Sequence, residues 1–127
     1  SFKTNNAVSL SPKFVINYVT KKREIITQDI NNELYLISLN GKLIWNINTG
    51  SPIIGDIHQI DLYKNGRLQY AFNTENDFQI IDKNGKLVKK IKNKNNLGLT
   101  VFDYDKVKNY RFLLFDSEIR ILDSKMK

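Results

Sequence analysis

The chain has 127 residues and a formal net charge of +7, which is enough material for one modest domain or for part of a larger one. Its content of 41% hydrophobic and 26% charged residues is that of an ordinary globular chain, and no apolar run is long enough to cross a membrane as a helix. The absence of cysteine excludes disulfides and thiolate metal sites.

Short runs rich in β-branched and aromatic residues follow one another along the chain. The first four are Lys13–Val19, Arg23–Asp29, Glu33–Leu39 and Lys42–Ile47. The next four lie near Ile57–Tyr63, Arg67–Asn73, Asp77–Asp82 and Lys86–Ile91, and later runs begin at Arg111 and at Ile119. No window carries an apolar period of 3.6 residues. The sequence therefore predicts an all-β chain.

The dipeptide Asn-Gly occurs three times between these runs, at Asn40-Gly41, Asn65-Gly66 and Asn84-Gly85. Flanked by strand-like runs, Asn-Gly is the strongest local hairpin signal, because a type I′ turn needs a positive φ at both central residues. We expect a type I′ turn at each of the three.

The sequence also repeats itself at an offset of 44 residues. Asn40–Leu43 meets Asn84–Leu87, both reading Asn-Gly-Lys-Leu, and in the third copy Ile119–Asp123 matches Phe78–Asp82 at an offset of 41. Two further sets align, one of Asn or Asp and one of Arg: Asn17, Asp61 and Asp105, and Arg23, Arg67 and Arg111. The matches predict a repeating unit of four strands, A to D.

A four-stranded antiparallel unit of this length is typical of a β-propeller blade. The repeat divides the chain into the end of a preceding blade and a linker (residues 1–12), blade one (13–56), blade two (57–98) and an incomplete blade three (99–127). Ser1-Phe2 aligns with Trp45-Asn46, which predicts that it belongs to a strand D. We expect consecutive blades of a larger propeller, completed either by the same chain or by identical copies.

The runs "ELYLISLNGKLIW" (Glu33–Trp45) and "DFQIIDKNGKLV" (Asp77–Val88) resemble the bacterial propeller repeats of the quinoprotein-dehydrogenase-like superfamily, with Trp45 at the signature position. The stretches Ile60–Phe72 and Phe102–Leu114 resemble degenerate integrin-type repeats. Residues 55–74 are similar to large propeller proteins of Bacteroidota-like bacteria. The resemblance implies the fold and favours an extracytoplasmic location, and since propellers host many functions it implies no chemistry.

The recurrent Asn or Asp has two interpretations. In an Asx turn the side chain accepts hydrogen bonds from its own backbone, and the Arg six residues later flanks the turn or pairs with a neighbouring blade. A calcium loop needs six to eight oxygen ligands, and lysines at positions 64, 106 and 108 lie among these carboxylates. The structural interpretation is favoured, and we expect no metal or cofactor in this chain.

Single residues give weaker signals. His58, the only histidine, has no partner for a triad or a zinc site and aligns with Phe14 and Phe102, which indicates a partly buried strand position. We expect Trp45 to pack between blades. The aromatic residues of strands A and B are expected in the core: Tyr63, Tyr70, Phe72, Phe102, Tyr104, Phe112 and Phe115.

The stretch Lys83–Asn96 carries six lysines and no acidic residue. Lysines on an outer edge strand deter unwanted strand pairing. The alternative is a patch for an anionic partner, formed by Lys86, Lys89, Lys90, Lys92 and Lys94, which predicts steeply salt-dependent retention on heparin. Lys, Asn and Ile occur 16 times each and Arg four times, a bias that a low-GC genome explains. A nucleic-acid partner is therefore not favoured.

The sequence contains no nucleophile constellation, metal cluster or phosphate-binding loop. We therefore expect a non-catalytic binding or scaffolding module whose loops contact a protein or a glycan. The alternative is part of an enzyme or of a cofactor-binding propeller whose site is completed by blades outside this chain.

Overall fold

The computed structural model describes residues 1–127 and contains strands and turns but no helix, and so no helix that could span a membrane. The strands are β1 (Lys13–Ile16), β2 (Arg23–Gln28), β3 (Glu33–Ser38), β4 (Leu43–Asn48), β5 (Ile53–Ile60), β6 (Gln69–Thr74), β7 (Asp77–Ile81), β8 (Leu87–Lys92), β9 (Thr100–Asp103), β10 (Tyr110–Phe115) and β11 (Ile119–Leu122). The prediction of an all-β chain is confirmed.

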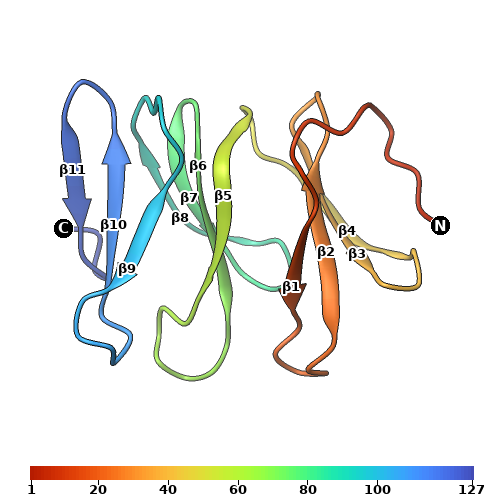
Figure 1. The fold of residues 1–127 in the computed structure, drawn as a ribbon, viewed down its shortest axis with the longest axis horizontal. Helices are drawn as coiled ribbons and strands as arrows, with labels where there is room; N and C mark the ends of the chain where they lie inside the picture. Colours follow the sequence, from red (N-terminus) through yellow and green to blue (C-terminus); the bar gives the residue numbers. More distant parts are fainter. The chain divides into compact units, whose positions relative to one another are not determined.

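The strands form three antiparallel sheets in which neighbours in sequence are neighbours in space (Figure 1). Sheet one has the order β1-β2-β3-β4, sheet two the order β5-β6-β7-β8, and sheet three contains β9, β10 and β11. The chain divides into two compact units, Ser1–Ile53 with sheet one and Ile54–Lys127 with sheets two and three. We call the successive strands of each sheet A, B, C and D.

The hairpin between strands C and D is the same in sheets one and two. Its ladder pairs Glu33 with Asn48 in sheet one, and 44 residues later Asp77 with Lys92 in sheet two. The register shifts at the same place in both, which leaves Ile44 and Val88 as the extra residues of matching bulges. The repeat of sequence is therefore a repeat of backbone geometry in this hairpin.

The turns of these hairpins differ from the prediction. Gly41 and Gly85 have φ values of 79° and 81°, whereas neither preceding Asn has a positive φ, so the turns are not of type I′. Ser38 N–H donates to the Lys42 carbonyl and Gly41 N–H to the Ser38 carbonyl, which leaves a three-residue loop. Such a loop combines a type I turn with one left-handed glycine, so only the glycine is conformationally required.

Strand B does not follow the offset of 44. Strand C pairs Ile37 with Ile25, and the equivalent Ile81 and Leu122 pair with Tyr70 and Phe112. Equivalent positions of strand B are therefore 45 residues apart between sheets one and two and 42 residues apart between sheets two and three. The turn between B and C is one residue shorter in sheet two than in sheet one, because Gln28 pairs with Leu34 but Asn73 with Phe78. Because the B–C turn absorbs the change in length, the apolar residues of strands B and C stay on the same faces of each sheet.

The shift separates the three aligned arginines. Arg23 lies two residues before Ile25, Arg67 three before Tyr70, and Arg111 directly before Phe112. They occupy three different places in the sheets, so their alignment in sequence is not an alignment in space. Arg23 stacks over Phe14, with its Cζ 5.6 Å from the ring centroid, and Arg111 stacks over Tyr104 at 4.5 Å.

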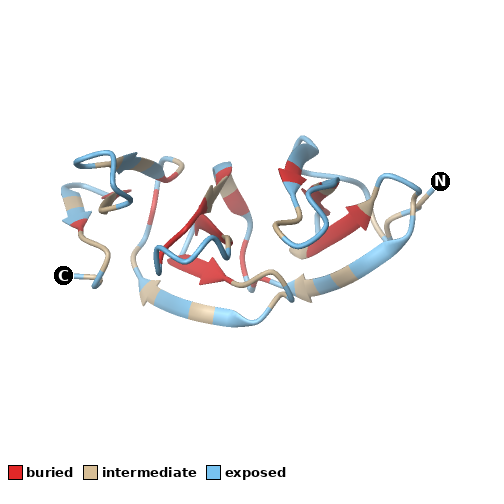
Figure 2. Ribbon diagram, turned by 90° about the horizontal axis from the view of Figure 1, so that it is seen from below, coloured by how far each residue is buried: buried red, intermediate tan, exposed pale blue.

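Burial is highest in the middle strands. Every residue of β6 and β7 is buried, whereas β4 and β8 are exposed or half-buried edge strands (Figure 2). Among the aromatic residues expected in the core, Tyr70, Phe72 and Phe112 are buried and Phe115 is half-buried. The prediction is wrong for Tyr63, Phe102 and Tyr104, which are exposed. Two of them lie in turns after strand A, where no second sheet layer covers them.

The first twelve residues form no strand. Ser1 and Phe2 are in no strand here, and their assignment to the strand D of a preceding blade stays a prediction. The ring of Phe2 instead packs against Tyr35, with centroids 5.7 Å apart, and Val8 forms an isolated bridge with Asp29. This segment therefore lies over sheet one as a loop.

Candidate functional site

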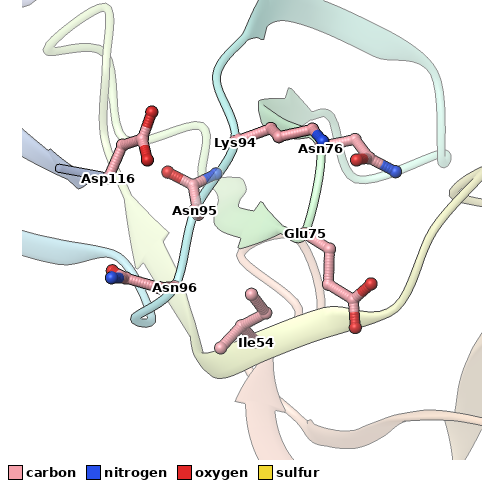
Figure 3. Close-up of a pocket in the computed structure, with 7 residues that line it drawn as sticks. All are labelled: Ile54, Glu75, Asn76, Lys94, Asn95, Asn96 and Asp116. Carbon is pink, nitrogen blue, oxygen red and sulfur yellow. The ribbon is translucent and has the colours of Figure 1, made fainter.

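A polar depression of about 510 Å³ lies in the second unit, where the turn between β6 and β7 meets the linker from β8 to β9. It is lined by Ile54, Glu75, Asn76, Lys94, Asn95, Asn96 and Asp116. Figure 3 shows Lys94 extending toward Asn76, and the carboxylates of Asp116 and Glu75 on opposite sides of Asn95. Except for Ile54, every side chain of the lining can form hydrogen bonds.

Asn95 is the buried anchor of this depression. Its Nδ2 donates to the carbonyl oxygens of Thr74, at 2.9 Å, and Asp77, at 3.0 Å, and its backbone N–H donates to the Glu75 carbonyl at 3.1 Å. Its Oδ1 accepts a hydrogen bond from Asn93 Nδ2 at 2.7 Å. These hydrogen bonds hold the β8–β9 linker against the β6–β7 turn, and this fixes the positions of the exposed side chains beside it.

The turn itself is held by Thr74. Its Oγ1 accepts from the backbone N–H groups of Asn76 and Asp77, both at 3.1 Å, and it lies 2.6 Å from Asp77 Oδ1. On the other side of the depression, Asn96 N–H donates to the Phe115 carbonyl at 3.1 Å. Sequence reasoning missed Asn95 and Thr74, and the run Asn93–Asn96 after an edge strand was the available signal.

Two glycines bring strand β5 and the linker before β9 close together near Ile54. A Cβ built on Gly55 would lie 2.7 Å from the Gly98 Cα, and Gly55 has a φ of 71°. Any larger side chain would push the two backbones apart. This close approach fixes the spacing between β5 and the linker that leads into β9, next to Ile54 of the depression.

The predicted lysine patch continues from this depression. A second depression of about 480 Å³ is lined by Asn76, Asp77, Lys90, Lys92, Asn93 and Lys94, so the two share Asn76 and Lys94. Lys86, Lys89, Lys90, Lys92 and Lys94 are all exposed on or beside the edge strand β8. Lys90 Nζ lies 3.6 Å from Asp77 Oδ2, and the edge position agrees with a role in deterring strand pairing.

The three predicted A–B turn residues, Asn17, Asp61 and Asp105, each lie just after a strand A. Asn17 Oδ1 accepts from the N–H of Val19 at 2.9 Å, and Asp105 Oδ1 accepts from that of Val107 at 3.1 Å. These are the local bonds of Asx turns. In the third turn Asp103 does more, accepting from Lys108 N–H at 2.7 Å and from Asn109 N–H at 3.2 Å; the repeat offset did not point to it.

Asp61 differs from the other two because its side chain is only 2% exposed. It accepts from the N–H groups of Asn65, at 3.0 Å, and Gly66, at 2.8 Å, and from Lys108 Nζ at 2.6 Å. Burial opposes its ionisation, but these donors together hold the pKa of Asp61 below its usual value. The hydrogen bond to Asp61 likewise raises the pKa of Lys108.

The oxygens of these turns are therefore already used by N–H and ammonium donors. The structure contains no group of three or more acidic or histidine side chains arranged to hold a metal ion. Gly66, with a φ of 78°, closes the turn around Asp61. The hydrogen bonds of these residues hold the backbone of the turns.

The remaining single residues are on strands. His58 is half-buried in β5, as expected, and its Nε2 lies 2.8 Å from the Leu99 carbonyl oxygen. Trp45 is half-buried on β4, where it pairs with Leu36; its packing between blades stays a prediction. Neither residue lines the depression of the second unit.

Comparisons with known proteins give little beyond this description. No protein-family model matches the chain, and no curated protein matches it. Among solved structures, the chain is similar to a protein of unknown function from Bacteroides caccae, with 16% sequence identity and a TM-score of 0.46. The alignment covers 96% of this chain and 54% of the other, so the chain spans about half of that protein's length.

Proposed function

We propose that the three sheets are consecutive blades of a β-propeller and that the chain is a non-catalytic binding module for a glycan. Two observations support the blade interpretation. The sheets are antiparallel meanders, and the C–D hairpin recurs after 44 residues with the same register and the same bulge. Repeats of 40 to 50 residues with four strands are the building unit of propellers.

The observation that carries the binding function is the anchored polar depression. Its exposed groups are two amides, two carboxylates and an ammonium, from Asn76, Asn96, Glu75, Asp116 and Lys94. Amides both donate and accept, and carboxylates accept from hydroxyls, so the set matches the dense hydroxyl groups of a sugar. Because Asn95 fixes the backbone beneath them, little conformational freedom is lost on binding.

The proposal is tested with an array of neutral and uronic-acid oligosaccharides, followed by calorimetric titration of the sugars that bind. Asn96→Ala and Glu75→Ala should each weaken binding by about tenfold, since one hydrogen bond to a ligand contributes about 1 to 1.5 kcal/mol. Asn46→Ala, an exposed asparagine on β4, serves as the control and should bind as the parent chain does.

Two results would count against a glycan site. The first is an array without any bound sugar, which would leave a protein partner as the alternative ligand. The second is binding that survives both depression variants unchanged, which would place the sugar elsewhere on the molecule.

A further inference from the structure

Sheets two and three pack face to face through apolar side chains of their strands B and C. The contact is made by residues that are all buried: Ala71, Phe78 and Ile80 from sheet two, and Phe112, Leu114 and Leu122 from sheet three. The rings of Phe78 and Phe112 are 5.2 Å apart between centroids. This packing shows which face of a sheet of this repeat receives the next sheet.

The same receiving face is exposed on sheet three. Phe78 and Ile80 of β7 correspond in the repeat to Ile119 and Ile121 of β11, which are 62% and 59% exposed. The ladder agrees, because Ile121 pairs with Leu113 as Ile80 pairs with Ala71. Cross-strand partners lie on the same face of a sheet, so this outer face of sheet three carries Leu113, Phe115, Ile119 and Ile121.

The complementary face of sheet one can be identified from its ladder in the same way. Phe14 pairs with Ile25 and Ile25 with Ile37, just as Val101 pairs with Phe112 and Phe112 with Leu122 in sheet three. Sheet one therefore carries the counterpart of the surface that sheet three packs on sheet two.

That surface of sheet one is only partly covered. Phe2 packs on Tyr35 toward one end of the surface, but Phe14 is 60% exposed. A recess of about 160 Å³ is lined there by Pro12, Lys13, Phe14 and Ile25. A bulky apolar side chain from another sheet can therefore enter it.

We infer that a second copy of this chain docks head to tail, with the Phe14–Ile25 surface of its sheet one on the Ile119–Ile121 surface of sheet three. The packing of sheet three on sheet two shows how the two kinds of surface fit together, and each chain carries one surface of each kind. The two surfaces differ, so the contact is heterologous and repeats to give a ring or an open filament. Neither surface contains a residue of the polar depression, so this docking is independent of the proposed glycan site.

The test is the native mass by light scattering and sedimentation over a wide range of concentration. The parent chain should form multiples of its 14.8 kDa mass. Ile121→Lys and Phe14→Lys should each be monomeric, since each places a charge in one of the two surfaces. Leu87→Lys changes a similarly exposed residue, at 55%, outside both surfaces and should assemble as the parent does.

Mixing the two variants distinguishes this contact from a symmetric one. Ile121→Lys keeps an intact sheet one and Phe14→Lys an intact sheet three, so an equimolar mixture should form a dimer and stop there. A parent chain that stays monomeric, variants that assemble normally, or a mixture that stays monomeric would each overturn the inference. Glutamine at either position replaces lysine if circular dichroism shows a loss of β-structure.

Discussion

The most deeply buried carboxylate of each unit is an aspartate, Asp29 in the first and Asp61 in the second, and the two are stabilised by different kinds of donor. Asp29 of the first unit is fully buried and accepts from Tyr35 Oη at 2.9 Å, from the N–H groups of Asn31 and Glu33, and weakly from Asn6. Asp61 of the second unit has the two backbone donors of its own turn and the ammonium of Lys108. All donors to Asp29 are uncharged, whereas the donors to Asp61 include an ammonium group.

Both arrangements lower the pKa of the carboxyl. In each case burial opposes ionisation and the hydrogen bonds more than offset it. The difference lies in what remains when the carboxylate is removed. The Tyr35 hydroxyl is buried with the rest of its side chain, whereas the Lys108 side chain is 49% exposed and can return its ammonium to water. The neutral site should therefore be the more fragile.

The largest expected effect is that of Asp29→Ala. It leaves the Tyr35 hydroxyl and two N–H groups without their acceptor, and we expect a loss of about 3 kcal/mol in the free energy of unfolding. Asp61→Ala should cost about 2 kcal/mol, because Lys108 can be rehydrated. Urea unfolding can be followed by circular dichroism and by the fluorescence of Trp45, the only tryptophan, which reports on the first unit.

Asp29→Asn is the matched control for the first variant, since its amide oxygen can still accept from a backbone N–H. It should lose less than Asp29→Ala. An equal loss for the two alanine variants, or a larger one for Asp61→Ala, would contradict the ranking of the two sites.

Acid should weaken the first unit through Asp29. A carboxyl whose pKa is lowered by folding contributes stability that is complete above its unfolded value of about 3.9 and is lost as the pH falls through the folded value. Asp29→Asn has no proton to bind, so its Trp45-detected unfolding midpoint should fall less between pH 5 and pH 2 than that of the parent. Equal acid sensitivity in both chains would show that Asp29 is not the titrating group.

The contrast between the two carboxylates also shows what the sequence can and cannot predict. The all-β class, the strands and the C–D hairpins follow from local residue patterns, so they could be located to within a few residues. The repeat singled out Asp61 but gave it the same weight as Asn17 and Asp105, both of which are less buried. Its burial depends on Lys108, 47 residues away, and no local pattern encodes that contact.

Asp29 and Asn95 were missed for a related reason. Each sits in a turn or linker where Asn and Asp are common, and what distinguishes them is the number of donors or acceptors that distant segments bring to them. The register of strand B failed differently. The alignment of the three arginines at an offset of 44 hid the one-residue change in the B–C turn. Only the pairing of the strands shows which residues share a face.

The smallest effect, and the one most specific to the comparison, is a dependence on salt. Lys108→Met removes the cation from Asp61 but leaves its two N–H donors, so it should lower the urea midpoint less than Asp61→Ala does. Half of the Lys108 side chain is in contact with water, and at 1 M salt the screening length is about 3 Å. The difference in urea midpoint between Lys108→Met and the parent should therefore shrink from low salt to 1 M NaCl.

Tyr35→Phe, which removes a neutral donor from Asp29, should show the same deficit in urea midpoint at both salt concentrations. Lys106→Met controls for the loss of an exposed lysine from the same turn. A deficit of Lys108→Met that is independent of salt would mean that Lys108 acts as a hydrogen-bond donor much as Tyr35 does, and the distinction between the two sites would then be one of burial alone.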